Sequence, residues 1–520
     1  MPDGVKPPDI GLPDGSTSPY CASATIHASE TLFDFALDNK LGVIQDTYEV
    51  DNESNTHSVR TSGEIRVKRV PKSSTKYRSR GVVAIDTHVS NENLQSLILK
   101  TWDENSHSMR ISVPRMASIP AHDNCISLEI TVYIPEDATL SELSIRATVL
   151  ALRVFDDIKI KVTGDAAFAS LSGDIYFPEL NGFDPSAAYP LDSRHITVET
   201  VSGNIKGIYP LFDSLKIGSQ SGDINVGVYP QPVLPSEPAP ADLEVGTASG
   251  EIDVRLPVQL PRYTPPARDY VTHVGSVSGD ISGSYFLGSV GDFKSTSGEI
   301  IAKVLPVIQY SPSTDPDDAP KTQFNTWSVS GTHDFEVLEP IFISLLPTNN
   351  AVQPEQPQQP TQPNTPSPPS LPTLPTPSDP AQHHTPEPYI PIGDDDPYRD
   401  IISPELNEDT ILPDVISAKM IKQRRTVSSK KWRTLTATHK TSSAKISVRY
   451  PEAWEGTVYE STVSGETGVK GKDLRILTYK KGWAYKELLA AKGVNKKGEG
   501  SSVTIGSISG DLVFAVGEEK

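Results

Sequence analysis

Apolar and polar residues alternate along most of the chain, and the alternation breaks at short polar phrases such as the SQSG of SQSGDINVGV, residues 219–228. Counted from Gly222, apolar residues lie seven and five positions before the glycine and two, four and six positions after it. These positions are Leu215, Ile217, Ile224, Val226 and Val228. Period-two alternation on both sides of a polar break predicts two short strands, each burying one face, joined by a turn.

The phrase returns along the chain as LSGDIYF, VSGNIKG, ASGEIDV, VSGDISG, TSGEIIA and ISGDLVF. The predicted repeat-turn glycines are Gly173, Gly203, Gly222, Gly250, Gly279, Gly298, Gly465 and Gly510, with a weaker copy at Gly331. From Gly173 to Gly331 the intervals are 30, 19, 28, 29, 19 and 33 residues, so the bare unit is 19 residues long. Glycine adopts positive φ without steric cost and serine bonds nearby backbone, so the Ser-Gly pair suits a tight corner.

One unit of this length cannot bury its apolar face alone. Stacked at the inter-strand spacing of about 4.8 Å, successive units would share a continuous core of Ile, Val and Leu ladders. The sequence therefore predicts an all-β fold, a β-solenoid or β-helix of about 19-residue coils with loop insertions, together with a disordered proline-rich linker.

The composition divides the chain into five predicted parts. These are a disordered N-terminal segment (1–25), an N-terminal β-rich region (26–119), the SG-repeat solenoid (120–345), the proline-rich linker (346–415) and a basic C-terminal β region with further SG repeats (416–520). The linker carries proline at nearly every third position over much of its length and predicts a semi-rigid spacer, which could also offer P-x-x-P ligands.

Two features of the N-terminal region add to this picture. RTSGEIRV, around Gly63, reads as a first copy of the repeat phrase. ASETLFDFALDN, residues 28–39, is the helical candidate, with Ser29 as its cap.

The long intervals between repeats all carry their extra residues shortly after the second strand. These insertions are rich in proline and tyrosine and are PELNGFDPSAAYPLDS, YPQPVLPSEPAPA, PVQLPRYTPPAR and PVIQYSPSTDPDDAPK. Because they occupy equivalent corners, we expect them to gather on one edge, which would be a binding face. The alternative is that proline there stops strands and blunts edges.

The residue after each Ser-Gly pair forms an acidic column. Its members are Asp174, Asn204, Asp223, Glu251, Asp280 and Glu299. A row of like charges either solubilises the surface or holds a cation such as calcium, and one carboxylate per coil favours the solubilising role. We therefore expect no metal and no cofactor. A glycan lyase or hydrolase using Asp174, Asp223 and Asp280 is the enzymatic alternative, but a uniform column lacks the separated pKa values of an acid–base pair, so we expect no enzyme.

Charge is distributed unevenly along the chain. The net charge is −19, yet residues 417–520 carry 20 Lys and Arg against 10 Asp and Glu. The basic stretch from Lys419 to Lys440 is the candidate contact with an anionic surface, through Lys422, Arg424, Arg425, Lys430, Lys431 and Arg433. One aromatic residue in that stretch and no recognisable nucleic-acid module argue against a specific nucleic-acid partner.

Cysteine content and hydropathy add little. Cys21 and Cys125 leave room for one disulfide and lack metal or redox spacing. The first twenty residues lack the basic start and apolar run of a secretory signal, and no window approaches eighteen apolar residues, so a cytoplasmic location is the default expectation.

The phrase TVYIPEDATLSEL together with the serial SGDI, SGNI and SGEI phrases resembles the putative-adhesin repeat domains of bacteria and fungi. VRYPEAWEGTVYESTVSG is similar to fungal members. The resemblance covers roughly residues 120–340 and 440–520 and implies a β-solenoid without catalytic residues. The expected function is a non-enzymatic adhesin-like or scaffold protein whose edge loops bind a protein or a glycan; the rival is an anionic-membrane-surface or regulatory protein led by residues 419–440.

Overall fold

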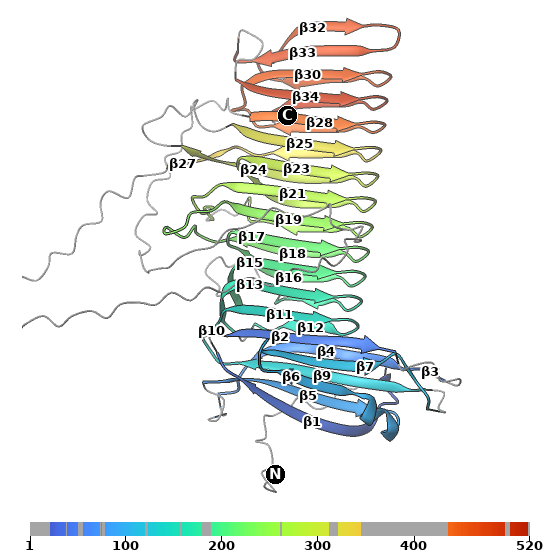
Figure 1. The fold of residues 1–520 in the computed structure, drawn as a ribbon. Coiled ribbons are helices and arrows are strands. Elements are labelled where there is room, and N and C mark those ends of the chain that lie inside the picture. Colours follow the sequence, from blue (N-terminus) through green and yellow to red (C-terminus); the bar gives the residue numbers. More distant parts are fainter. Residues whose placement is uncertain are drawn as a thin grey trace, which may run out of the picture. The chain divides into compact units, whose positions relative to one another are not determined.

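The computed structural model describes residues 21–37, 39–49, 56–72, 74, 79–119, 123–156, 158–178, 189–259, 263–310, 321–344, 435–494 and 500–517. Within these ranges the chain is nearly all β, and most of its strands belong to two large sheets, A and B. One 3₁₀ helix, Glu92–Leu97, is found among the described residues. The strands are stacked along one direction (Figure 1), and side chains between the two sheets form one long apolar core.

Sheet A contains, in spatial order, β1 (Ile26–Phe35), β5 (Gly81–Val89), β9 (Cys125–Ile134), β4 (Arg60–Arg69), β12 (Ala151–Val154), β14 (Ile175–Tyr176), β16 (Ile205–Leu211), β18 (Ile224–Pro230), β20 (Ile252–Arg255), β22 (Ile281–Leu287), β24 (Ile300–Tyr310), β26 (His333–Val337), β29 (Ile446–Tyr450), β35 (Leu512–Val516) and β31 (Thr467–Gly471). β27 (Ile341–Ser344) pairs with the end of β24. From β9 onward these strands pair in parallel.

Sheet B contains, in spatial order, β6 (Leu99–Asp103), β7 (Ser108–Pro114), β2 (Lys40–Tyr48), β11 (Glu142–Ala147), β13 (Ile160–Ser170), β15 (Leu191–Thr200), β17 (Ser214–Ser219), β19 (Ala241–Thr247), β21 (Tyr270–Ser276), β23 (Val290–Ser295), β25 (Thr322–Ser328), β28 (Leu435–Thr441), β34 (Ser501–Ser507), β30 (Gly456–Thr462), β33 (Lys486–Lys492) and β32 (Arg475–Lys481). β10 (Ala138–Leu140) pairs with β13, and β3 (His57–Ser58) pairs with β8 (Met116–Ala117) as a separate two-stranded sheet.

The predicted alternation is confirmed by burial. From β15 to β26 the chain passes from a strand of sheet B, through a Ser-Gly turn, to a strand of sheet A, and then returns to sheet B. The isoleucine two residues after each turn glycine stacks in register on the next one, and each is at most 1% exposed. This ladder is Ile175, Ile205, Ile224, Ile252, Ile281 and Ile300. Inward residues therefore form the continuous core that the period-two pattern predicts.

Two predictions for the N-terminal region are wrong. Residues 28–39 do not form a helix, because residues 26–35 are strand β1, which pairs antiparallel with β5 from Ile26↔Val89 to Phe35↔Gly81. Sheet pairing here overrides a weak local helical preference. Gly63 is not a repeat turn, since it lies inside β4 with φ of 139°, where a Cβ atom would come within 1.9 Å of the Leu128 carbonyl oxygen.

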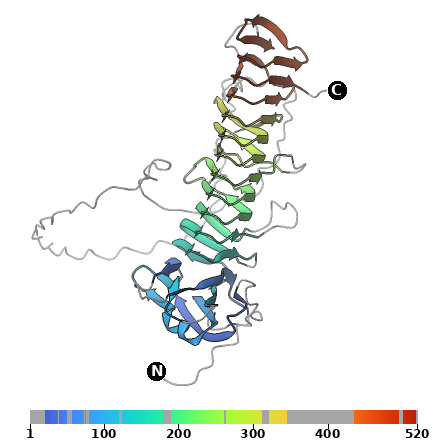
Figure 2. The same ribbon diagram turned by 90° about the vertical axis from the view of Figure 1, so that its right-hand side faces the viewer.

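The C-terminal strands continue both sheets. β28 pairs in parallel with β25, and β29 with β26. The order then departs from the sequence, because β34 and β35, the last strands of the chain, lie between β28/β29 and β30/β31. Figure 2 views the same stack after a turn of 90°, with the N-terminal strands at one end and the C-terminal strands at the other.

Two further observations concern the chain as a whole. Cys21 and Cys125 form a disulfide with Cα atoms 5.8 Å apart. No helix in the described ranges is long and apolar enough to cross a membrane.

Candidate functional site

Eight of the Ser-Gly turns are closed by a hydroxyl three residues before the glycine, whereas at Gly331 the Ser328 hydroxyl donates to the glycine carbonyl oxygen instead. Ser219 Oγ accepts the Gly222 N–H at 2.8 Å, and Thr247 Oγ1 accepts the Gly250 N–H at 3.0 Å. The same bond closes the turns at Gly173, Gly203, Gly279, Gly298, Gly465 and Gly510. This Ser/Thr column was not predicted, although the sequence contains it as a hydroxyl residue three positions before each of these glycines.

The repeat glycines are required for close approach between turns, and the predicted reliance on positive φ is wrong. None of the predicted turn glycines has positive φ. Instead, a Cβ atom on Gly222 would lie 1.8 Å from the Gly203 carbonyl oxygen, and one on Gly250 would lie 2.0 Å from the Gly222 carbonyl oxygen. Backbone occupies the space that any side chain would need, so the turns stack directly on one another.

Side chains of the acidic column accept hydrogen bonds from backbone N–H groups of the next turn. Asp174 Oδ1 accepts the Asn204 N–H at 2.7 Å, Asn204 Oδ1 accepts the Asp223 N–H at 3.0 Å, and Asp223 Oδ1 accepts the Glu251 N–H at 2.9 Å. Asp280 accepts the Glu299 N–H in the same way. These side chains join successive units. No group of three or more His, Cys, Asp or Glu side chains among the described residues is placed to hold a metal ion.

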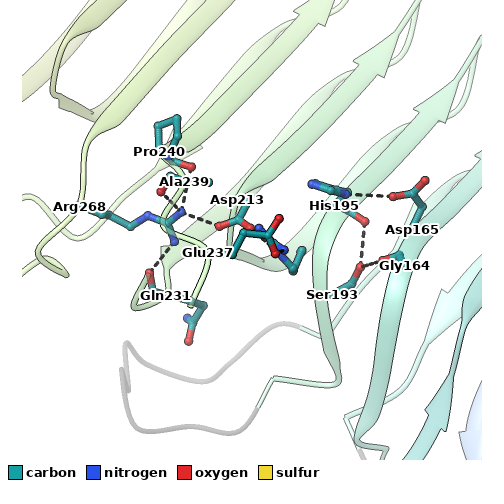
Figure 3. A network of polar contacts seen from close by, with 11 residues as sticks. Gly164, Asp165, Ser193, His195, Asp213, Gln231, Glu237, Ala239, Pro240 and Arg268 are labelled. Atoms are coloured by element: carbon teal, nitrogen blue, oxygen red, sulfur yellow. Dashed lines mark hydrogen bonds and ion pairs between the residues drawn. The ribbon is translucent and has the colours of Figure 1, made fainter. Parts of the chain in front are cut away.

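Two of the predicted edge loops, residues 229–241 and, apart from 260–262, residues 257–268, lie in the described ranges and are tied together by one buried arginine. Arg268, in the loop between β20 and β21, donates to the carbonyl oxygens of Gln231, Ala239 and Pro240 in the loop between β18 and β19, at 2.8–3.0 Å (Figure 3). Its guanidinium also pairs with Asp213 at 2.8 Å, and both side chains are almost completely buried. The two loops therefore gather at one edge, as their equivalent positions predict.

Arg194 extends this network toward the surface. It pairs with Asp213 and with Glu237 of the first loop. Although burial acts to lower the pKa of Arg194, its hydrogen bonds to these two carboxylates raise it. Asp213 thus lies between two guanidinium groups, and the β18–β19 loop is fixed to the strands below it.

Ser193, His195 and Asp165 lie beside this network without forming a nucleophilic triad. His195 Nδ1 is 3.0 Å from Asp165 Oδ1. The hydroxyl of Ser193 donates instead to the carbonyl oxygens of Gly164 at 3.0 Å and of His195 at 2.9 Å (Figure 3). The imidazole and the hydroxyl therefore do not share a proton, which a general base and its nucleophile would have to do.

A groove of about 1020 Å³ runs over the outer face of sheet A and crosses seven neighbouring strands, from β16 to β29. Its polar lining consists of Lys206, Asn225, Asp253, Arg255, Ser282, Ser284, Lys303, Asp334, Glu336 and Arg449. Gly207, Gly227 and Gly283 lie on the sheet within it, and residues 256–259 line it where the β20–β21 loop leaves the sheet. Six intervals of about 4.8 Å make the groove roughly 29 Å long.

Three cations of the groove share one register column. Arg255 pairs in register with Ser284, Ser284 with Lys303, Lys303 with Glu336, and Glu336 with Arg449. The cation column, defined here as Arg255, Lys303 and Arg449, therefore presents a positive charge on every second strand, at intervals of about 9.6 Å. Arg255 pairs with Asp253, and Lys303 with Glu336 at 3.0 Å.

The groove lies outside our predicted sites, although part of its signal is present in the sequence. Arg255 and Lys303 each lie five residues after a repeat glycine. Arg449 lies five residues after Ala444, which takes the place of the glycine in a turn that lacks the Ser-Gly phrase. Gly510 stacks on this turn, since a Cβ atom added to Gly510 would lie 1.6 Å from the Ala444 carbonyl oxygen. Because this turn has alanine where the others have glycine, a search for the Ser-Gly phrase does not find Arg449.

The other predicted site residues cannot be placed. Lys422, Arg424, Arg425, Lys430, Lys431 and Arg433 lie outside the described residues. So do the proline-rich linker and most of the two edge loops at 179–188 and 311–320.

No protein-family model matches the chain, and no curated protein is similar to it in sequence. Among solved structures it is similar to "a putative adhesin" from Bacteroides fragilis, at 9% identity and a TM-score of 0.22, over 61% of this chain and 97% of that one. "Putative adhesin" from Parabacteroides merdae matches at 8% identity and a TM-score of 0.19, over 61% and 93%. "A putative cell adhesion protein" from Clostridium sporogenes matches at 7% identity and a TM-score of 0.13, over 94% and 99%. These similarities assign neither a family nor a function to this chain.

Proposed function

We propose that this chain is a non-enzymatic, adhesin-like binding protein that holds an extended acidic polysaccharide in the groove on sheet A. The observation that carries the proposal is the cation column, because a positive charge on every second strand complements a linear polymer that bears anionic groups at regular intervals. Ser284 lies between Arg255 and Lys303, and Glu336 lies between Lys303 and Arg449. The glycines that line the groove, Gly207, Gly227 and Gly283, leave the backbone of the sheet accessible, so a polymer can approach it closely.

The architecture supports this proposal as a β-solenoid of about 19-residue repeats. Parallel pairing, stacked Ser-Gly turns and a continuous isoleucine ladder are what such a stack requires. Outward residues at one register position then repeat along the stack axis, so a linear ligand can make the same kind of contact with successive units. The Cys21–Cys125 disulfide supports an oxidising compartment, which is where an adhesin would act.

The carboxylates of the groove support binding in preference to acid–base catalysis. Asp253 and Glu336 each form an ion pair with a cation of the column. These carboxylates are therefore already engaged with the cations that would contact the ligand.

The test is the affinity of the purified full chain for an immobilised acidic polysaccharide, polygalacturonate, and for neutral dextran, in EDTA so that calcium bridging does not contribute. We expect binding to polygalacturonate that weakens steeply with salt, and little binding to dextran. Lys303→Ala combined with Arg449→Ala should weaken binding at least about tenfold, since hydrogen bonds to charged groups contribute roughly 1.5–3 kcal/mol each.

Lys216→Ala is the matched control, because Lys216 is a similarly exposed lysine on sheet B that pairs with Glu244 at 3.3 Å. It should leave the affinity unchanged. Equal binding to dextran and polygalacturonate, or equal loss in the control and the groove variant, would overturn the proposal. Capture of a protein partner with no polysaccharide signal would favour the scaffold alternative.

A further inference from the structure

The C-terminal end of sheet B carries a hairpin whose apolar side chains are exposed. β32 and β33 form this antiparallel hairpin, and β33 attaches it to β30. All seven residues of β32 are exposed, and among the described residues β33 is its only strand partner. The hairpin lies at the opposite end of the stack from β1 (Figure 1).

Five large apolar or aromatic side chains are concentrated there. This set, named here the hairpin patch, consists of Ile476, Leu477, Tyr479, Trp483 and Tyr485, each at least 47% exposed. Trp483, in the turn between the two strands, is completely exposed. Single exposed apolar residues are normal on a protein surface, whereas a group of them such as this Trp and two Tyr on one short hairpin is typical of an interaction site.

The charge around the patch identifies the kind of partner. Residues 470–486 contain six cations, Lys470, Lys472, Arg475, Lys480, Lys481 and Lys486, against the single acid Asp473. Three of them form ion pairs with carboxylates outside this range, Lys472 with Glu452, Lys480 with Glu487 and Lys486 with Glu466, so the surroundings of the hairpin keep a smaller net positive charge. Indole and phenol rings sit at the headgroup level of a bilayer, and lysine side chains extend from there toward anionic headgroups. Aromatic residues at a hairpin turn, flanked by lysines, match that interface in both chemistry and charge.

A second copy of the chain fits the same surface poorly. Pairing two β32 edges would bring two sets of cations together, at a cost in electrostatic repulsion. The register of β32 also shifts between Ile476 and Thr478, and such a bulge, like edge lysines, opposes edge-to-edge pairing. An anionic surface would attract these cations instead of repelling them, and binding to it does not require strand pairing.

We propose that the β32–β33 hairpin docks onto the surface of an anionic lipid bilayer, with Trp483 inserted at the headgroup level and the surrounding lysines bound to lipid anions. This site is distinct from the groove on sheet A and from the basic segment 419–440. The protein would lie on the membrane through one end of the stack, which leaves the groove accessible to its own ligand.

The experiment is co-sedimentation of the purified full chain with vesicles of phosphatidylcholine alone and of phosphatidylcholine with roughly a third phosphatidylserine. We expect binding to the anionic vesicles only, reduced at moderately raised salt. Trp483→Ala should lower the partition coefficient about tenfold, as loss of a buried aromatic side chain implies. Lys480→Glu with Lys481→Glu should abolish binding.

Trp327→Ala is the matched control, because Trp327 is 45% exposed on β25, outside the hairpin. It should bind like the wild type, and circular dichroism should report the same fold for all variants. Absence of binding to anionic vesicles, or binding that Trp483→Ala leaves unchanged, would overturn the proposal. Loss of binding on Lys430→Glu with Lys431→Glu, with Trp483→Ala silent, would assign the membrane contact to the basic segment instead.

Two further readouts separate this proposal from its neighbours. Sedimentation velocity without lipid should report a monomer; a dimer that Trp483→Ala dissociates, with no vesicle binding, would overturn the proposal in favour of a second copy. Lys303→Ala with Arg449→Ala should leave vesicle binding intact even if it removes polysaccharide binding, so the two sites can fail independently.

Discussion

Replacing Gly250 by alanine tests why the repeat needs glycine. A Cβ atom there would lie 2.0 Å from the Gly222 carbonyl oxygen and 2.5 Å from its carbonyl carbon, and backbone cannot rotate away as a flexible side chain can. A carbon and an oxygen in contact need more than about 3 Å, so the two turns must separate by about 1 Å. Three hydrogen bonds cross this junction: Ser249 N–H to Gln220 O, Glu251 N–H to Asp223 Oδ1, and Ile224 N–H to Glu251 O.

At about 0.5–1.5 kcal/mol per bond, weakening these three contributes roughly 2–4 kcal/mol of destabilisation. Gly246→Ala is the matched control in the adjoining strand β19, because a Cβ atom there meets nothing closer than 3.8 Å. In urea unfolding of the full chain, the midpoint of Gly250→Ala should lie well below that of the wild type. The midpoint of Gly246→Ala should equal that of the wild type or lie slightly above it. Equal midpoints for the two variants would refute the close-approach explanation.

Three other predictions concern buried ionisable groups. Burial raises the pKa of Glu460 from 4.5 to about 8, so its neutral form contributes stability that is complete below pH 4.5 and lost as the pH rises through 8. The melting temperature of the wild type should therefore fall between pH 4.5 and 8, and in Glu460→Gln this fall should be smaller. Burial lowers the pKa of His439 to about 3, so its neutral form stabilises the fold above pH 6.5. The melting temperature of both the wild type and Glu460→Gln should therefore fall as the pH drops below 6.5. Arg268→Met leaves Asp213 buried beside Arg194 alone and removes the donor to three loop carbonyl oxygens. We expect the free energy of unfolding in urea to fall by roughly 3–5 kcal/mol, and polysaccharide binding to weaken.

The apolar ladder could be predicted from the sequence because it depends only on spacing. Leu215, Ile217, Ile224, Val226 and Val228 are all buried where period-two alternation places them. The reason for glycine at position 222 could not be predicted in the same way, because a positive φ and a close backbone approach both require glycine. Only the position of the neighbouring turn distinguishes the two causes.

The candidate site depended on information that no local pattern carries. Arg255 and Arg449 are 194 positions apart in the chain, yet four strand pairings put them in one column. The pairing of β26 with β29 spans the proline-rich segment, which composition alone reads as a boundary. Arg268 likewise looked like the end of an exposed proline-rich insertion, and only packing against Asp213 makes it a buried clamp.

The order of the C-terminal strands has a consequence for both proposed sites. β30 pairs with β33 and β34, and β31 pairs with β35, so among the described residues the strand pairing that links the hairpin to the earlier strands runs through β34 and β35. Every strand that lines the groove precedes β34 and β35 in the chain, because the groove ends at β29. The pairing that holds the hairpin includes residues 501–516, so docking through this hairpin would require the completed stack.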